Sequence, residues 1–199
     1  MGTREVRKIL YWVLGVAVAA AATAIGACNR NPVTEPKVKD EPAAAFRLTS
    51  PAFEDGQRMP KKYTGDGADL SPPLAWTDPS EGTKAFALLC DDLDAPRGPW
   101  NHWVIWNLPA DLRKLSEGIP KQKTLPDLGG ARQGNNSWPR IGYGGPTPPR
   151  GTGTHRYVFT LYALDTALDL EAGANKAALL AKMGGHVQDK TTLTGTFSR

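Results

Sequence analysis

Two histidines and two aspartates are the residues of this chain that could do chemistry together. Asp92 and Asp94 stand in the motif DDLDAP, His102 stands in PWNHW, and His155 follows a stretch rich in Gly and Pro. Imidazoles donate hydrogen bonds, most strongly when protonated, and a neighbouring carboxylate can fix an imidazole tautomer. Because a buried anion needs several donors, a cavity that gathered these groups could hold negative charge.

The same residue types raise the question of a metal or catalytic site. Two histidines and one carboxylate could bind a metal, but the chain lacks the short His-x-x-x-His spacing that would support one. A Ser-His-Asp triad would need a nucleophile, and Ser71, the nearest candidate, lies in no Gly-x-Ser-x-Gly motif. We therefore expect no metal and no enzyme, with weak phosphoester hydrolysis as the remaining catalytic alternative.

The four residues stand at or near the ends of segments that are typical of β-strands. Length, apolar content and β-branched or aromatic residues predict strands at 46–50, 84–91, 102–108, 156–164 and 191–197. Since a sheet holds the loops at its strand ends in place, Asp92, His102 and His155 are expected to converge there.

One helix is predicted, from Asn175 to Met183. Asn175 is a suitable N-cap, and the Gly-Gly pair after Met183 ends the helical pattern. The residues expected to face the sheet are Ala177, Leu180 and Ala181. Before it, residues 120–152 contain seven Gly and six Pro, which predicts a long structured loop.

The first 27 residues have the pattern of an export signal. A basic start is followed by an uncharged, Ala-rich run at 9–23, which is short for a membrane span. Ile25-Gly26-Ala27 before Cys28 resembles a bacterial lipobox, so we expect residues 1–27 to be removed and Cys28 to be lipidated. Plain secretion and an uncleaved anchor are the alternatives. Asn29 after the cysteine favours the periplasmic face of the outer membrane, if the organism is Gram-negative.

The rest of the chain divides into a tether and one domain. Residues 28–45 contain three Pro, mixed charge and few large apolar residues, which is typical of a flexible tether. Residues 46–199 are enough for one core. The net charge of +4 falls to +2 without residues 1–27, which hold three of 24 basic and one of 20 acidic residues. That balance argues against nucleic-acid binding. Cys90, in an apolar run, is expected to be buried.

Several motifs together resemble the phosphatidylethanolamine-binding protein family, in its bacterial Raf-kinase-inhibitor-like branch. They are FEDGQRMPKKYTGDGADLSPPLAW (53–76), GTKAFALLCDDLDAPRGPWNHW (82–103), HRYVFTLYALD (155–165), GGHV (184–187) and LTGTFSR (193–199). They stand in the family's order and span essentially all of residues 46–199. The resemblance implies a mainly β, antiparallel β-sandwich-like fold with few short helices, and a small anion pocket at one end.

The resemblance also implies, by position, which residues form that pocket. The ligand-binding residues would be Asp92, Asp94, Pro96, Trp100, His102, Tyr143, Gly145, Thr147 and His155. Backbone N–H groups of Gly144 and Gly145 would add donors. Two residues depart from the family pattern. Leu93 replaces the usual Pro between the acids, and Thr147 replaces a small residue or Cys, so its hydroxyl would either donate to the anion or partly fill the pocket.

The function that follows is that of a non-catalytic, cell-envelope binding protein. Its ligand would be a phosphate-type head group, as in a phospholipid, or a phosphorylated small molecule, with no cofactor. Histidine donors would bind the anion better near pH 6 than near pH 8, on either side of the usual imidazole pKa. The alternative is a protein-interaction inhibitor of a kinase or protease. Relatives suggest a homodimer, and the protein partner stays open.

Overall fold

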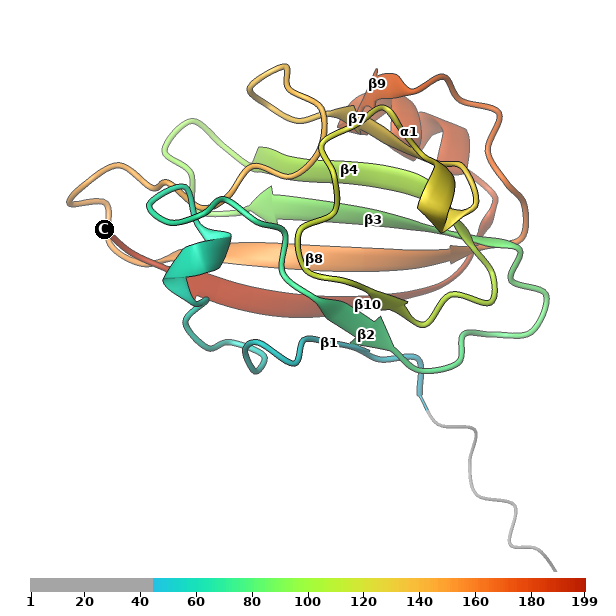
Figure 1. The fold of residues 1–199 in the computed structure, drawn as a ribbon, viewed down its shortest axis with the longest axis horizontal. Helices are drawn as coiled ribbons and strands as arrows, with labels where there is room; N and C mark the ends of the chain where they lie inside the picture. The colour runs from blue at the N-terminus through green and yellow to red at the C-terminus, as the bar shows by residue number, and fades with distance from the viewer. Residues whose placement is uncertain (1–44) are drawn as a thin grey trace, which may run out of the picture. The chain divides into compact units, whose positions relative to one another are not determined.

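Two antiparallel β-sheets form the described part of the chain, which in this computed structural model is residues 45–199 (Figure 1). The order of the larger sheet is β10 (Val187–Phe197), β8 (His155–Leu164), β3 (Ala85–Asp92), β4 (Trp100–Pro109), β7 (Ala131–Asn135) and β6 (Thr124–Leu125). Its seventh strand, β9 (Gly173–Asn175), pairs in parallel with β7. The smaller sheet consists of β1 (Leu48–Thr49), β2 (Leu74–Trp76) and β5 (Lys114–Leu115). The expected mainly β, antiparallel β-sandwich-like fold is confirmed.

The central strands β3 and β4 are buried on both faces. Phe86 and Leu88 of β3 belong to the core cluster shared with the smaller sheet. Ala87 and Leu89, which alternate with them, pack in a second cluster with the α-helix. Successive side chains of a strand point to opposite faces. Burial on both faces therefore explains why the sequence of β3 is continuously apolar. Cys90 is buried, as expected, and burial raises the pKa of its thiol.

The α-helix α1 (Lys176–Met183) begins where the sequence predicts, but it buries a different face. The Asn175 side chain caps it by accepting a hydrogen bond from the Ala178 N–H at 3.0 Å. Leu179 and Met183 are its buried residues. The expected inward positions, Ala177, Leu180 and Ala181, are exposed. An Ala- and Leu-rich helix offers apolar residues on several sides, and here Leu179 and Met183 fill the space beside β3 and β4.

The Gly- and Pro-rich stretch is more regular than expected. Within 120–152 the chain forms β6, the 3-10 helix η2 (Pro126–Leu128) and β7, whose residues pair with Ile105 and Trp106 of β4. The prediction of a loop throughout was wrong, because pairing with a distant strand leaves no local sequence signal. The other 3-10 helix is η1 (Lys61–Tyr63).

The predicted signal segment, the lipidation site Cys28 and nearly all of the predicted tether lie outside the described residues. Within residues 45–199, no helix combines the length and apolar character needed to cross a membrane.

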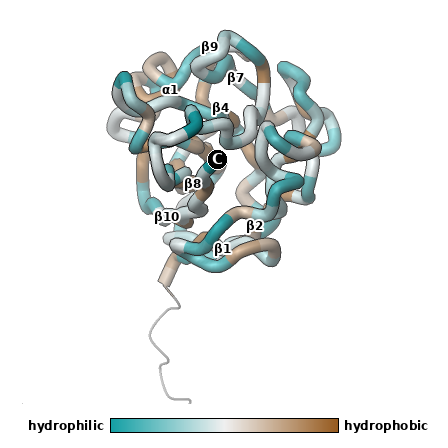
Figure 2. Tube along the Cα trace, turned by 90° about the vertical axis from the view of Figure 1, so that its left-hand side faces the viewer, coloured by the Kyte–Doolittle hydropathy of each residue, from teal (hydrophilic) through white to brown (hydrophobic). Residues whose placement is uncertain are grey.

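One end of the larger sheet collects the residues singled out above. β3 ends at Asp92, β4 starts at Trp100, and β8 starts at His155. The strands pair in register there, with Asp92 opposite Trp100 on one side and Tyr157 on the other. This end lies to the left in Figure 1, and Figure 2 looks onto it, with β4 above the C-terminus, β8 and β10 below it and to its left, and β1 and β2 lower still.

Candidate functional site

A cavity of about 390 Å³ opens at this end of the sheet. Its lining comes from three segments: the end of β3 with the turn after it, the start of β4 with Trp138, and the Pro-rich loop that leads into β8. The lining residues are Asp92, Ala95, Pro96, Arg97, Gly98, Trp100, His102, Trp138, Thr147, Pro148, Pro149 and His155. Apolar walls thus surround a small polar group made of one carboxylate and two imidazoles.

The structure brings most of the sequence-predicted site residues together. Six of them line this one cavity: Asp92, Pro96, Trp100, His102, Thr147 and His155. The other three, Asp94, Tyr143 and Gly145, do not line it. Asp92, His102 and His155 are also nearly inaccessible to solvent, with exposed fractions of 4%, 2% and 1%.

One wall of the cavity is a chain of hydrogen bonds through His155. Its Nδ1 lies 2.8 Å from Asp92 Oδ2, and its Nε2 lies 2.8 Å from the hydroxyl of Thr152. The other Asp92 oxygen accepts the N–H of Asp94 at 2.9 Å. The Thr152 hydroxyl also lies 2.7 Å from the carbonyl of Pro149. Both His155 nitrogens and both Asp92 oxygens therefore already have partners within the protein. This wall is named the β8 wall.

The other wall holds His102 by one nitrogen only and is named the β4 wall. His102 Nδ1 lies 2.6 Å from the carbonyl oxygen of Gly144. A carbonyl only accepts, so Nδ1 must carry the proton. Within residues 45–199, Nε2 has no hydrogen-bond partner. The ring meets those of Trp138 and Tyr157 edge-on, with centroids 4.9 and 5.1 Å away.

The charge state of His102 follows from its burial. Burial lowers the pKa of the His102 imidazole, because the charged form loses solvation. The Gly144 carbonyl and, more weakly, the carboxylates of Asp92, Asp91 and Asp69 act in the opposite direction. At neutral pH the ring is neutral, with the proton on Nδ1 and a lone pair on Nε2. The expectation that both histidines donate to an anion does not fit this geometry.

Asp94 points away from the cavity and pairs with Arg156. Its carboxylate accepts from the Arg156 backbone N–H at 2.9 Å and from Nε and Nη2 of the Arg156 guanidinium, each at 2.8 Å. These hydrogen bonds lower the pKa of Asp94 to about 2. Leu93, beside it, is 43% exposed and lies outside the cavity lining. Asp94 thus anchors the turn after β3 to β8.

The expected backbone donors of the Gly-rich loop are used inside the protein. Gly144 N–H donates to the carbonyl of His102 at 2.9 Å, and Gly145 N–H donates to Asp69 at 2.6 Å. The expectation that they face the anion was wrong, because a loop packed against β4 must satisfy its own buried N–H groups. Thr147 donates to the Gly145 carbonyl at 3.1 Å.

Tyr143 belongs to the core. It is 2% exposed, its hydroxyl donates to the Tyr63 carbonyl at 2.7 Å, and its ring packs edge-on against Trp103. Tyr143 and Gly145 line a smaller neighbouring cavity of about 160 Å³, which shares Thr147 with the main one. The position of Tyr143 in the family motif did not indicate which of the two cavities this residue would line.

Sequence reasoning missed three residues that matter here. Arg97 is an exposed cation on the cavity lining. Trp138 packs edge-on against Trp100, with ring centroids 5.3 Å apart, and closes one side. Thr152 holds His155. Arg97 stands between DDLDAP and PWNHW, so its place beside two site motifs was a usable signal. The other two lie in the Gly- and Pro-rich stretch, where spacing carries no such information.

The described residues 45–199 contain no group of three or more His, Cys, Asp or Glu side chains placed to hold a metal ion.

Comparisons with known proteins agree on one family. The family model described as phosphatidylethanolamine-binding protein matches residues 49–198. A UPF0098 protein of Methanothermobacter thermautotrophicus is 49% identical over 154 residues, which are 77% of this chain and 99% of that protein. The UPF0098 protein YbhB of Escherichia coli is 39% identical over 161 residues, 77% of this chain and 100% of that protein.

Solved structures give the same answer for the fold. The phosphatidylethanolamine-binding protein homologue CT736 of Chlamydia trachomatis is 38% identical, with a TM-score of 0.70 over 78% of this chain and 98% of its own. YbcL of Escherichia coli, described as a member of the mammalian family, is 29% identical, with a TM-score of 0.73 over 78% and 99% of the two chains.

Proposed function

The chain belongs to the phosphatidylethanolamine-binding protein family, and we propose that it is a non-catalytic binding protein whose cavity takes phosphate-type head groups or phosphorylated small molecules. The observation that carries the proposal is the meeting of Asp92, His102 and His155 on one cavity, although up to 63 positions separate them. Polar groups this deeply buried cost free energy unless they are paired, and His102 Nε2 is left open toward a ligand. The cavity volume of about 390 Å³ is large enough for a phosphate with a short substituent.

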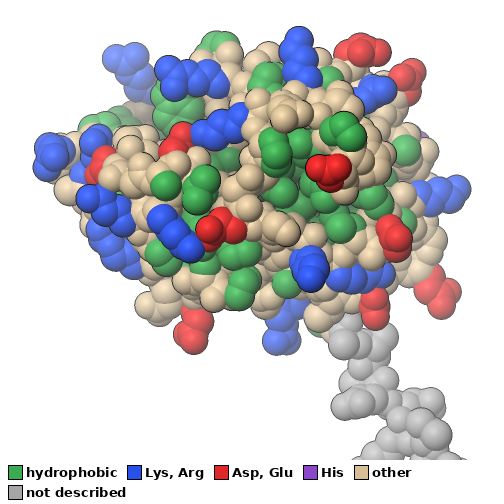
Figure 3. Space-filling view, in the orientation of Figure 1, with side chains coloured by type: hydrophobic (Ala, Val, Ile, Leu, Met, Phe, Trp, Pro, Cys, Tyr) green, Lys and Arg blue, Asp and Glu red, His purple; other side chains and the backbone are tan. Residues whose placement is uncertain are grey.

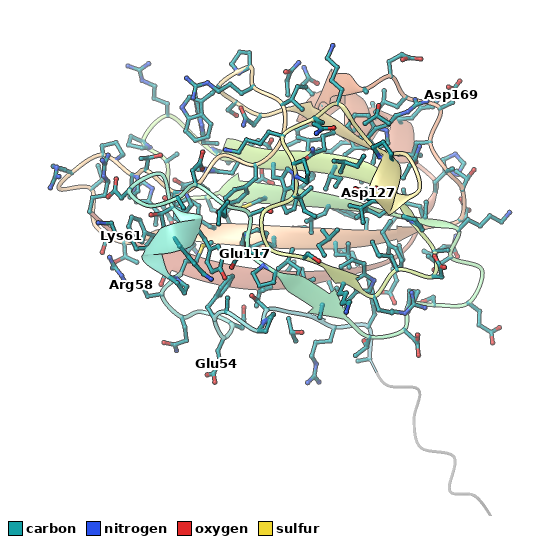
Figure 4. All side chains as sticks on the ribbon, in the orientation of Figure 1. Glu54, Arg58, Lys61, Glu117, Asp127 and Asp169 are labelled. Atoms are coloured by element: carbon teal, nitrogen blue, oxygen red, sulfur yellow. The ribbon has the colours of Figure 1, made fainter. Side chains whose placement is uncertain are left out.

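Two arginines at and near the cavity favour an anion there, although Asp92 also lines it. Arg97 lines it, and Arg150 lies on the exposed loop before β8; neither forms an ion pair within the described residues. Lys and Arg side chains gather toward this end of the molecule in Figure 3. Figure 4 shows the basic residues Arg58 and Lys61 toward this end, the acidic Asp127 and Asp169 toward the other, and Glu54 and Glu117 between them. Such an arrangement raises the local concentration of anions.

The pH dependence follows from His102. A proton on Nε2 would turn this atom from an acceptor into a charged donor, so anion affinity rises as pH falls. Because burial lowers the pKa of His102, that rise begins below the usual imidazole value of about 6.5. A bound anion stabilises the charged ring, so in the complex the increase in anion affinity begins at a pH closer to neutral. We expect tighter binding near pH 6 than near pH 8.

Calorimetric titration with inorganic phosphate tests the proposal. The variant His102→Ala lacks the open nitrogen Nε2. We expect its affinity for phosphate to fall at least about tenfold, because a hydrogen bond to a charged ligand is lost. His186→Ala is the matched control, because His186 is half exposed and pairs with Asp165 away from the cavity. Equal affinity in both variants, or no phosphate binding to the native protein, would contradict the proposal.

We also propose that the protein is exported and tethered to the cell envelope through a lipid on Cys28. This part rests on the sequence alone, since Cys28 lies outside the described residues. Metabolic labelling with a radioactive fatty acid should mark the native protein and leave Cys28→Ser unlabelled. Equal labelling of both, or of neither, would reject the lipid anchor.

A further inference from the structure

The open nitrogen of His102 decides which ionic form of a phosphate can bind. Gly144 fixes the proton on Nδ1 through the 2.6 Å contact, so Nε2 presents a lone pair to the cavity. A lone pair repels an oxygen that carries no hydrogen. A ligand can use this nitrogen only if it brings a proton of its own, or if the buried ring takes one up.

On the β8 wall, His155 cannot supply the missing donor without a rearrangement. His155 uses Nδ1 on Asp92 and Nε2 on the hydroxyl of Thr152, both at 2.8 Å. Asp92 brings negative charge to the cavity lining. An approaching phosphate oxygen therefore meets an acceptor on the β4 wall and a carboxylate on the β8 wall.

Without a ligand, the groups that face His102 are not enough to hold a second proton on its open nitrogen, Nε2. From β8, the ring of Tyr157 packs against it, and burial raises the pKa of that phenol, which therefore stays neutral. Asp92, Asp91 and Asp69 raise the pKa of His102, but the effect of burial outweighs them. Arg97, the cation on the cavity lining, opposes a second positive charge.

Resting on the function proposed above, we propose that the cavity selects the monoprotonated form of a phosphate monoester, whose P–OH donates to His102 Nε2 while its charged oxygens face Arg97. A phosphate monoester gains its second negative charge near pH 6, so both forms are present around neutrality. The dianion binds only with uptake of one proton.

This proposal distinguishes the two ligands considered above, a phospholipid head group and a phosphorylated small molecule. The phosphate of a phospholipid head group is a diester, which has no P–OH at neutral pH and cannot make this contact. A phosphorylated small molecule with a terminal phosphate can. The site is therefore expected to prefer monoesters to phospholipid head groups.

Inorganic phosphate and sulfate provide a direct test, because they have the same shape but only phosphate carries a proton near pH 6. Titration of the native protein should give a sulfate dissociation constant at least about tenfold above that of phosphate, from loss of one charged hydrogen bond. Dimethyl phosphate, the diester probe, should bind as weakly as sulfate. Near pH 8, calorimetry in two buffers of different ionisation enthalpy should report uptake of about one proton per phosphate.

His102→Asn shows whether Nε2 is responsible. The shorter amide can still donate to the Gly144 carbonyl but leaves the position of Nε2 empty, so phosphate and sulfate should bind within about threefold of each other. His186→Asn is the control and should keep the native ratio. A thermal unfolding curve close to the native one establishes that either variant is folded.

The possible results separate the two proposals. If sulfate and dimethyl phosphate bind as tightly as phosphate, the selection of a proton-bearing ligand is wrong and the anion site stands. If the native protein binds none of the three, the anion site itself is wrong. If His102→Asn keeps the native preference for phosphate, the selection does not come from His102, and the inference falls.

Discussion

The two walls of the cavity hold their histidines in opposite ways. On the β8 wall, His155 is bonded through both nitrogens, to Asp92 and Thr152. On the β4 wall, His102 is bonded through one nitrogen, to Gly144, and the other is open. Both rings are almost fully buried. The comparison indicates two roles: the β8 wall stabilises the structure of the cavity, and the β4 wall contacts the ligand.

This difference separates stability from binding. A fully paired buried group is costly to disrupt, because its partner is left without compensation. A group with one open position loses less when it is replaced, since only its single internal contact disappears. Substitutions on the β8 wall should therefore act mainly on folding, and those at His102 mainly on affinity.

The largest expected effect is that of Asp92→Ala. Asp92 is a buried carboxylate that lies within hydrogen-bond distance of the His155 ring and accepts the Asp94 N–H, and leaving such buried partners unpaired typically costs about 1–3 kcal/mol each. Urea denaturation near pH 7 measures the loss. Asp94→Ala, whose side chain is partly exposed, is the control and should lose less than about 1 kcal/mol. Equal losses in the two variants would remove the structural role assigned to the β8 wall.

A smaller effect is expected at Thr152. Thr152→Val keeps the shape but removes the hydroxyl that meets His155 and Pro149, at a cost of about 1 kcal/mol. Thr154→Val, in the same exposed loop but with no side-chain hydrogen bond among the described residues, should stay within about 0.5 kcal/mol of the native protein. If both variants are equally stable, the Thr152 contact adds nothing to the wall.

The smallest effect belongs to Asp94→Asn. The pKa of Asp94 is lowered to about 2 by Arg156, so its contribution is present above the unfolded value of about 4 and is lost as pH falls through about 2. Because the pair is solvent-screened, the loss near pH 7 should be below about 1 kcal/mol. Unfolding free energies of the native protein and the variant should converge as pH approaches 2, and a constant difference would contradict this origin.

The sequence predicted the sheet better than its surroundings. Residues 84–91 and 156–164 are β3 and β8 to within one residue, because their apolar and β-branched content leaves no alternative. β7 was missed, since its pairing with β4 depends on residues far away in the chain. The buried side of α1 was wrong because Leu179 and Leu180 are adjacent and equally apolar, and only packing chooses between them.

The site was predictable as a set of residues but not as a set of roles. Motifs placed Asp92, His102 and His155 together, and the strand ends carry them to one cavity. Hydrogen-bond direction was not available from sequence, because it depends on which atom each ring meets. The Gly144 carbonyl, rather than its N–H, faces His102 Nδ1, so the nitrogen left for a ligand, Nε2, is an acceptor in the neutral ring and not the donor expected of this histidine.

The nitrogen chemical shifts of the His102 imidazole, measured with and without inorganic phosphate, test the central claim most directly. In the free protein at neutral pH, Nδ1 should report a bound proton and Nε2 a lone pair. Saturating phosphate should shift Nε2 of His102 toward a hydrogen-bonded or protonated state and leave His186 unchanged. A proton already on Nε2 of the free protein, or His102 signals that do not respond to phosphate, would contradict the account.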